Sequence, residues 1–346
     1  MIRVAVADDS PSTCRLLKSY MEDAGDCEVV GVATDAASTL DLVRRTAPDV
    51  ITLDLFMPGA GGLDLLQQLT AKPNVRVVVI SGVTRRAAAT TLRALELGAV
   101  DFVLKYTPGV PVRPSSLARE IVTKVRAAAA AQPHASRALK RVAAAPAAPK
   151  AAKRARAIPR GPGAVVVLGA STGGPAALRD VLAELPHDFA TPCVIVQHLP
   201  APFVAPFAEQ LARHARLPVR EATPSDQVEP GRLLVSPGSK HLLLRSEGRI
   251  ELREPSEQDL YRPSIDASMM SAAEIYGRDA IGVVLTGMGS DGSEGLSRIR
   301  DSGGIGCVQD PATCLVPSMP ARALERAGAD YVGPPNRIGA LLAGRG

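Results

Sequence analysis

One compositionally biased segment divides this chain of 346 residues into two parts. Residues 127–162 are rich in alanine, proline, lysine and arginine and contain almost no large apolar side chain. Such a segment buries too little apolar surface to offset the entropy that is lost on folding. We therefore expect a linker over 127–162, between an N-terminal domain over 1–126 and a C-terminal domain over 163–346. The alanine-rich start of the linker can also prolong the helix before it.

The positive charge of the chain belongs to the same region. The chain has a net charge of +5, yet the window from Ile121 to Arg179 contains eleven Lys and Arg and no acidic residue. Without that window the net charge is 5 minus 11, or −6. A basic run suits nucleic-acid phosphates. However, the segment has no aromatic residue and no helix-turn-helix pattern follows it, so we expect a solvated linker and no nucleic-acid partner.

Composition also limits the class of protein. Aromatic residues make up only 3% of the chain and tryptophan is absent, so the cores must consist of Val, Leu and Ala, which suits helices packed on parallel strands. The longest apolar runs are too short to span a membrane, and the first ten residues lack a signal-peptide pattern. The five cysteines are dispersed and form no C-x-x-C pair. We expect a cytoplasmic protein with reduced thiols and no membrane insertion.

Strand-like runs and helical patterns alternate five times before the linker. The strand-like runs are Val4–Ala7, Glu28–Ala33, Val50–Leu53, Val75–Ile80 and Ala99–Leu104. The helical patterns cover 11–23, 36–46, 62–70, 84–97 and 114–128. This alternation predicts a doubly wound α/β domain with a five-stranded parallel sheet.

The region after the linker repeats the alternation on a larger scale. Apolar strands are expected at 164–168, 192–197, 232–235 and 280–285, with helices near 175–185, 202–215, 266–276 and 292–302. Residues 241–254 alternate in polarity around Glu247-Gly248, which predicts a hairpin. We expect a second doubly wound α/β domain, with a mostly parallel sheet and an antiparallel hairpin at its edge.

Polar side chains follow successive strands of the first domain. These residues are Asp8, Asp9, Asp54, Ser81 and Lys105. The carboxyl ends of parallel strands meet at one edge of a sheet, where ligands bind. Crowded carboxylates favour Mg²⁺, and a metal-neutralised carboxylate beside a lysine and a hydroxyl can accept a phosphoryl group. The acidic pair also suits a helix cap, but the five strand-end residues together favour the phosphoryl site.

Through these residues the region 1–125 resembles a response-regulator receiver domain. The resemblance implies phosphorylation of Asp54 by a histidine kinase. It further implies Mg²⁺ ligation by Asp8, Asp9, Asp54 and the Phe56 carbonyl, and switching by Ser81, Phe102 and Lys105.

A glycine-rich loop between a strand and a helix is the main feature of the second domain. The loop reads "GASTGGP" and contains G-x-S-x-G, with Ser171 at its centre. Glycines around an exposed serine are typical of a nucleophile elbow. A phosphate-binding loop would need a lysine after the glycines, and none is present. A turn that only packs a helix on a strand remains an alternative.

A nucleophilic serine needs a base and an acid that orients it. His198 follows a buried-type strand, and Asp291 lies in the glycine-rich loop of "LTGMGSDGSEG". His241 and Asp266 are the alternatives, because each also lies beside a predicted element. The chain order of Ser, His and Asp differs from that of the α/β-hydrolases, so that fold is not expected.

The motifs "GASTGGP", "QHLP", "RPSID", "LTGMGSDGSEG" and "QDPATCLVPSMP" together resemble the chemotaxis protein-glutamate methylesterase (CheB) family. The resemblance implies Ser171 as nucleophile, His198 as base and Asp291 as the orienting acid. Thr172 and the Met288 backbone would lie near the oxyanion. The family cleaves glutamate methyl esters in the cytoplasmic helices of chemoreceptors, and some members also deamidate glutamine. The resemblance further implies that the receiver masks the active site until Asp54 is phosphorylated.

We expect a monomer that needs Mg²⁺ for phosphorylation and no cofactor for ester hydrolysis. Some positions depart from the family patterns. These are Ala60-Gly61, where Met-Asp is usual, Tyr106, where proline is usual, and Ser239 and Ser318, where glycine is usual. A catalytically silent adaptor with the same fold is the other alternative, and the intact Ser/His/Asp set argues against it.

Overall fold

The computed structural model describes residues 1–58, 61–72, 74–82, 84–105, 114–131 and 158–345. The chain divides into two compact units, with the division between residues 134 and 135. Most of the expected linker therefore lies outside the described residues, as do Ala60 and Tyr106. The alanine-rich start of that segment does prolong the preceding helix, which ends at Ala130.

The first unit is built on a five-stranded parallel sheet with the order β2-β1-β3-β4-β5. Its strands are β1 (Ile2–Ala7), β2 (Cys27–Ala33), β3 (Val50–Asp54), β4 (Arg76–Ser81) and β5 (Asp101–Leu104). β3 is buried along its whole length, as expected for an inner strand whose two faces are both covered by helices.

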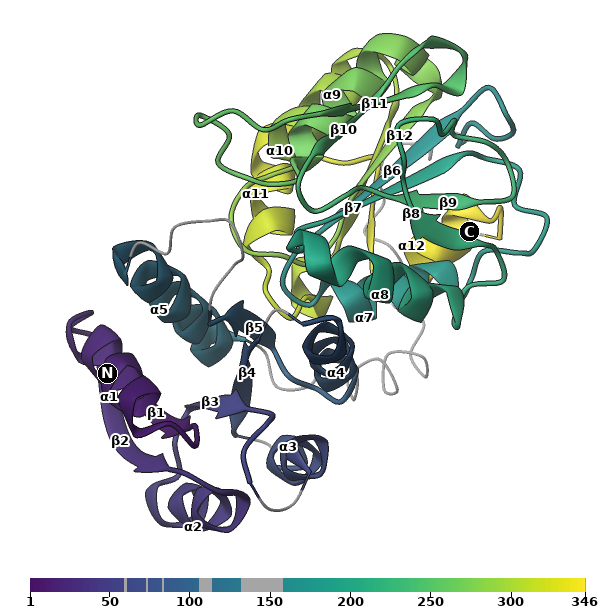
Figure 1. Ribbon diagram of the computed structural model, residues 1–346. Helices are drawn as coiled ribbons and strands as arrows, with labels where there is room; N and C mark the ends of the chain where they lie inside the picture. Colours follow the sequence, from purple (N-terminus) through teal and green to yellow (C-terminus); the bar gives the residue numbers. More distant parts are fainter. Residues whose placement is uncertain (59–60, 73, 83, 106–113, 132–157, 346) are drawn as a thin grey trace. The chain divides into compact units, whose positions relative to one another are not determined.

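Five helices cover the two faces of this sheet. They are α1 (Pro11–Glu22), α2 (Ala36–Thr46), α3 (Gly62–Thr70), α4 (Arg85–Glu96) and α5 (Pro114–Ala130). α1 packs beside α5 on one face, and α2, α3 and α4 lie in a row on the other (Figure 1). The predicted doubly wound domain is thus confirmed.

The second unit contains a seven-stranded sheet in which every pairing is parallel, with the order β14-β13-β12-β6-β7-β9-β8. Its strands are β6 (Val165–Ala170), β7 (Cys193–Gln197), β8 (Val219–Glu221), β9 (Leu233–Val235), β12 (Ala280–Val284), β13 (Ile305–Gln309) and β14 (Tyr331–Gly333). β6 lies at the centre. Because its neighbours β7 and β12 both run parallel to it, the three strands end at the same edge of the sheet.

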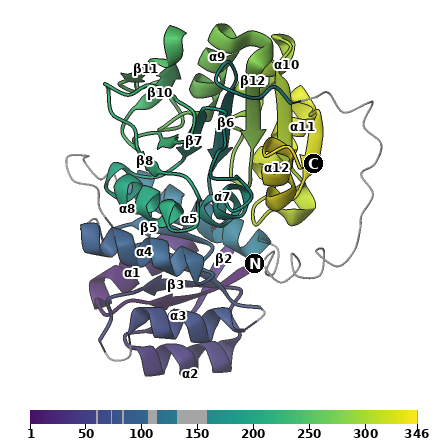
Figure 2. The same ribbon diagram turned by 90° about the vertical axis from the view of Figure 1, so that its right-hand side faces the viewer.

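Helices again cover both faces. They are α7 (Gly174–Leu182), α8 (Ala201–Ala212), α9 (Ile265–Tyr276), α10 (Ser293–Asp301), α11 (Ser318–Ala327) and α12 (Pro335–Leu342). α9, α10 and α11 pack together on one face, whereas α7, α8 and α12 lie on the other (Figures 1 and 2). Connections that run in opposite directions from the central strand place their helices on opposite faces, since crossovers are right-handed.

The structure refines the prediction for this unit in two ways. The expected hairpin is present as β10 (His241–Leu244) and β11 (Ile250–Arg253), but it forms a separate two-stranded sheet instead of the edge of the large one. Its first strand, β10, packs against α9. The sequence reading also missed β8, β13, β14, α11 and α12, of which β8 and β14 are only three residues long.

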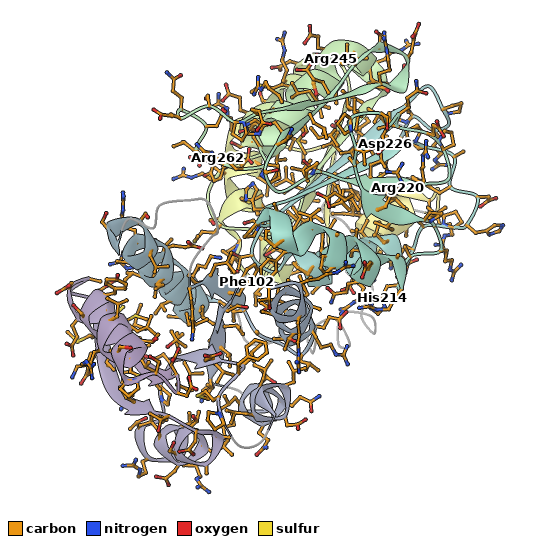
Figure 3. All side chains as sticks on the ribbon, in the orientation of Figure 1. Phe102, His214, Arg220, Asp226, Arg245 and Arg262 are labelled. Atoms are coloured by element: carbon orange, nitrogen blue, oxygen red, sulfur yellow. The ribbon has the colours of Figure 1, made fainter. Side chains whose placement is uncertain are left out.

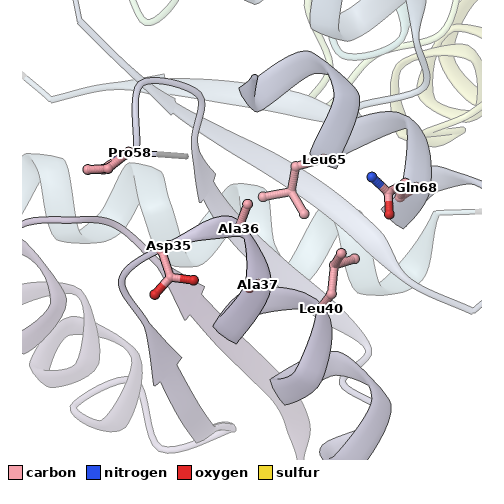
Figure 4. A pocket seen from close by; sticks show the side chains of 7 residues that line it. All are labelled: Asp35, Ala36, Ala37, Leu40, Pro58, Leu65 and Gln68. Carbon is pink, nitrogen blue, oxygen red and sulfur yellow. The ribbon is translucent and has the colours of Figure 1, made fainter. Parts of the chain in front are cut away.

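The structure also contains a pocket in the first unit, and its helices can be tested for membrane-spanning length. A pocket between α2 and α3 is lined mainly by apolar side chains (Figure 4); its residues are Asp35, Ala36, Ala37, Leu40, Pro58, Leu65 and Gln68. No helix within the described part of the chain has the length and apolarity that crossing a membrane requires.

Candidate active site and phosphoacceptor site

The three predicted catalytic positions follow three adjacent strands of the second unit. Ala170 and Gln197 form the last register pair between β6 and β7, so Ser171 and His198 are the next residues along these two strands. On the other side of β6, the Ser171 amide donates a hydrogen bond to the Thr286 carbonyl at 3.1 Å. The expected edge of the sheet therefore carries Ser171 and His198, with the loop that contains Asp291 beside them.

The backbone around Ser171 requires glycine for two reasons. Gly173 has a φ of +79° at the start of α7, a conformation that other residues rarely adopt. At Gly287, an added Cβ would lie only 2.7 Å from the Cβ of Ser171. The glycines thus bring the loop after β12 against the serine, while Gln197 Nε2 donates to the Ser171 carbonyl at 2.9 Å.

His198 and Asp291 are in direct contact. His198 Nε2 lies 2.8 Å from Asp291 Oδ2, and the Asp291 side chain is completely buried, whereas 15% of the His198 side chain is exposed. No hydrogen bond within the described residues joins the Ser171 hydroxyl to His198. The structure therefore brings the histidine and the acid together and places the serine at the adjacent strand end.

Asp291 is held by a dense set of donors. Its carboxylate accepts hydrogen bonds from the amides of Ile265 at 2.7 Å, Asp266 at 2.8 Å and Gly292 at 3.1 Å. Burial alone would oppose ionisation, but His198 and the amides of Ile265 and Asp266 outweigh it and hold the pKa of Asp291 below its usual range. A buried carboxylate that stays ionised can orient an imidazole and stabilise its protonated form.

The two alternatives from the sequence lie in different surroundings. The His241 side chain is fully buried; its Nδ1 accepts a hydrogen bond from the Ser264 amide at 3.0 Å, and its Nε2 lies 3.1 Å from Asp259. Asp266 accepts a hydrogen bond from the Gly295 amide at 2.7 Å. Burial, together with the neighbouring Asp291, raises the pKa of Asp266 to about 7. Neither residue contacts His198 through a described hydrogen bond.

The residues expected near the oxyanion also lie at this edge. The carbonyl of Thr172 accepts a hydrogen bond from the Thr286 hydroxyl at 3.0 Å. Within the described chain, no group accepts a hydrogen bond from the Met288 amide. Ser318 bridges the residues on either side of Met288, because its hydroxyl donates to the Gly287 carbonyl at 3.0 Å and accepts from the Gly289 amide at 3.2 Å.

Sequence reasoning missed one side chain at this site. The ring of Tyr261 stacks on His198, with 5.2 Å between the ring centroids and 7° between the planes. Tyr261 directly precedes the "RPSID" motif, but no periodicity or spacing in the chain connects it with a histidine more than sixty residues away. Only the folded chain places the two rings together.

The strand ends of the first unit bring three carboxylates together. One oxygen from each of Asp8, Asp9 and Asp54 lies within 4.8 Å of the other two. Lys105 Nζ lies 2.8 Å from Asp8 and 2.7 Å from Asp54. Burial disfavours the charged lysine, but these two carboxylates outweigh it and raise the pKa of Lys105. This all-oxygen donor set fits Mg²⁺.

The remaining residues named for the receiver function lie close by. The Phe56 amide donates to Asp54 Oδ1 at 2.9 Å, and the Phe56 side chain is exposed. The Ser81 hydroxyl is paired with the hydroxyl of Thr91 at 2.6 Å. Phe102 is buried at the centre of β5, the position labelled in Figure 3. Their roles as metal ligand and switch residues stay predictions.

These observations define a class of protein: a receiver-type α/β unit with three carboxylates and a lysine clustered at one sheet edge, followed by a hydrolase-type α/β unit with a serine and a His–Asp pair at one sheet edge. The model of the CheB methylesterase family matches residues 166–342. The model of the response regulator receiver domain matches residues 4–110. The chain therefore belongs to the CheB methylesterase family and carries an N-terminal receiver domain.

Individual relatives agree over almost the whole chain. A protein-glutamate methylesterase/protein-glutamine glutaminase of Caldanaerobacter subterraneus subsp. tengcongensis is 38% identical, over 99% of this chain and 95% of the relative. A protein of the same description, numbered 5, from Anaeromyxobacter dehalogenans is 41% identical over 96% and 93%. The crystal structure of the CheB methylesterase catalytic domain of Thermotoga maritima is 38% identical; it covers 53% of this chain and 98% of its own, with a TM-score of 0.51.

Proposed function

We propose that this chain is a phosphorylation-regulated protein-glutamate methylesterase that removes methyl groups from glutamate methyl esters of chemoreceptors. The contact between His198 and Asp291, beside Ser171 at the same sheet edge, is the observation that carries the proposal. Membership of the CheB family supports the substrate class. The names of the relatives also support a second reaction at the same site, the deamidation of protein glutamine.

In the proposed mechanism the two nitrogens of His198 have separate tasks. Because Nε2 is paired with Asp291, Nδ1 is the nitrogen that remains to take the proton of Ser171. The serine oxygen then attacks the ester carbon and forms a tetrahedral intermediate. Asp291 stabilises the imidazolium that results, and the imidazolium returns the proton to the departing methanol. Water attacks the acyl-serine in the same way and releases the glutamate carboxylate.

The negative charge of the intermediate needs hydrogen-bond donors close to Ser171. The Met288 amide is a suitable donor, because it lies on the loop that Gly287 brings against the serine. One such donor typically contributes about 3–4 kcal/mol to the transition state. Ser318 holds both neighbours of Met288, and Thr172 would complete this side of the site.

The receiver unit supplies the control in this proposal. Asp54 would accept the phosphoryl group, and Asp8, Asp9 and the Phe56 carbonyl would hold Mg²⁺ beside it. The metal would neutralise the crowded carboxylates, and Lys105 provides a second positive charge. Phosphorylation would then shift the receiver between two states and release the masked active site. The proposed partners are a chemotaxis histidine kinase and the methylated cytoplasmic helices of a chemoreceptor.

The test of the proposal is methanol release from methylated receptor by the full chain. Replacing the nucleophile, Ser171→Ala, is expected to abolish release. Ser302→Ala is a matched control, because Ser302 follows α10 and comes three residues before the start of β13, at the end of the sheet opposite to Ser171. Release by Ser171→Ala at the wild-type rate would overturn the proposal, as would a wild-type protein that releases no methanol.

A further inference from the structure

Several polar contacts hold the segment between β11 and α9 in place. His241, on β10, accepts a hydrogen bond from the Ser264 amide at 3.0 Å and lies 3.1 Å from Asp259. Asp259 in turn accepts hydrogen bonds from the amide and the hydroxyl of Ser256 at 2.6 and 2.9 Å. Arg262, labelled in Figure 3, donates to the Ser256 carbonyl at 2.8 Å. These contacts hold the residues on both sides of Tyr261.

Tyr261 contacts the candidate active site at two points, His198 after β7 and Ser290 in the loop after β12. Its ring lies almost parallel to the imidazole of His198, at a centroid distance of 5.2 Å. Its hydroxyl accepts a hydrogen bond from the Ser290 amide at 3.1 Å, directly before Asp291. Gly289 makes this approach possible, because an added Cβ there would lie only 2.5 Å from the tyrosine oxygen.

An imidazole that is held by one hydrogen bond can still swing about that bond. The contact with Asp291 fixes the position of His198 Nε2, but it leaves the ring plane free to tilt. A second ring stacked against the imidazole removes that freedom, since aromatic pairs favour a narrow set of geometries. The direction of Nδ1 is then determined by the two constraints together.

We propose that Tyr261 is a positioning residue for His198, whose ring holds the imidazole plane so that Nδ1 is aimed at the Ser171 hydroxyl. The inference rests on the proposed esterase function and names a further residue that acts through the base. In this role Tyr261 acts through the orientation of the imidazole and not through proton transfer; its hydroxyl oxygen accepts the hydrogen bond from the Ser290 amide.

Two replacements separate the ring from the hydroxyl. Tyr261→Leu removes the aromatic face, and it is expected to lower kcat for methanol release about tenfold, the upper range of what an aromatic pair contributes. KM should stay within about twofold, because substrate binding does not depend on the imidazole plane. Tyr261→Phe keeps the ring and should retain kcat within about threefold. The control is Leu260→Ala, which truncates a 91% exposed neighbour in the same segment and should leave kcat unchanged.

A readout without turnover distinguishes this inference from the esterase proposal. The ¹H–¹³C NMR signal of the His198 ring, assigned by its loss in His198→Gln, should move in Tyr261→Leu and stay in place in Tyr261→Phe, because only the first change removes the ring current. An unmoved signal in Tyr261→Leu, an unchanged kcat, or a raised KM with normal kcat would each overturn the positioning role. If the NMR shifts appear as expected but the wild type releases no methanol, the esterase proposal fails and the stacked geometry stands.

Discussion

Replacement of Asp291 by asparagine tests the central contact of the site. The substitution keeps the shape of the side chain but removes its charge. For unit charges 2.8 Å apart, the separation of Asp291 from His198, Coulomb's law with an effective dielectric constant of about 20 gives about 6 kcal/mol. The asparagine dipole retains part of this attraction to the imidazolium, so we expect about 4 kcal/mol of the interaction energy to be lost. Because each 1.36 kcal/mol changes a rate tenfold, kcat should fall about a thousandfold.

The same substitution also affects folding. Both oxygens of Asp291 accept hydrogen bonds, one from Ile265 and the other from Asp266 and Gly292. An asparagine amide group must therefore face at least one backbone N–H, at a cost of about 1–3 kcal/mol. The loss of activity must be measured where the variant is still folded, which circular dichroism verifies before the methanol assay.

Asp266→Asn is the matched control for this experiment. Asp266 is a neighbouring carboxyl that is not hydrogen-bonded to His198, and its Gly295 contact needs only an acceptor oxygen, which asparagine supplies. Its kcat should stay within about threefold of the wild type. The reasoning is refuted if folded Asp291→Asn retains more than about a tenth of the wild-type kcat, or if Asp266→Asn loses as much as Asp291→Asn.

Three further predictions concern the two histidines, the phosphoacceptor Asp54 and the carboxyl group of Asp266. His198→Ala should lower kcat for methanol release far more than His241→Ala. His241→Ala should lower Tm more, as melting curves would measure, because His241 is fully buried and accepts a hydrogen bond from the Ser264 amide. With Mg²⁺ and acetyl phosphate, the wild type should gain activity and Asp54→Asn should not. The pKa of Asp266 is raised to about 7 in the folded protein and is near 4 in the unfolded chain. Between these two pH values the folded protein keeps a proton on Asp266 that the unfolded chain has released, so the free energy of unfolding falls as pH rises through this range. Asp266→Asn should therefore raise Tm at pH 8 relative to the wild type and leave it unchanged near pH 4.

Much of the fold could be predicted because it depends on local patterns. Apolar runs of strand length that alternate with amphipathic stretches predict the strands and helices of the first unit and, apart from β8, those of the second unit as far as α10. Their observed bounds differ by only a few residues. Alternating strands and helices in turn predict parallel sheets with right-handed connections. The short outer strands β8 and β14 were missed because three residues carry too little periodicity.

Local patterns were also enough to predict which residues stand at the carboxyl edges of the sheets. A residue at the end of a parallel strand or directly after it must lie at that edge, whatever the strand order; Asp54 ends β3, and Lys105, Ser171 and His198 directly follow their strands. What the sequence left open was the choice between residues with equivalent local contexts. His241 and His198 both lie beside strands, and Asp266 and Asp291 both lie at the start of helices.

Which of these side chains lie together depends on how the strands and helices pack. The strand order β12-β6-β7 places His198 beside the loop that contains Asp291, whereas His241 belongs to the separate hairpin. The pairing through Nε2 and the ring of Tyr261 were likewise beyond the reach of any local pattern. These contacts join residues 63 and 93 positions apart, and they exist only after the chain has packed, because no short-range preference encodes a long-range distance.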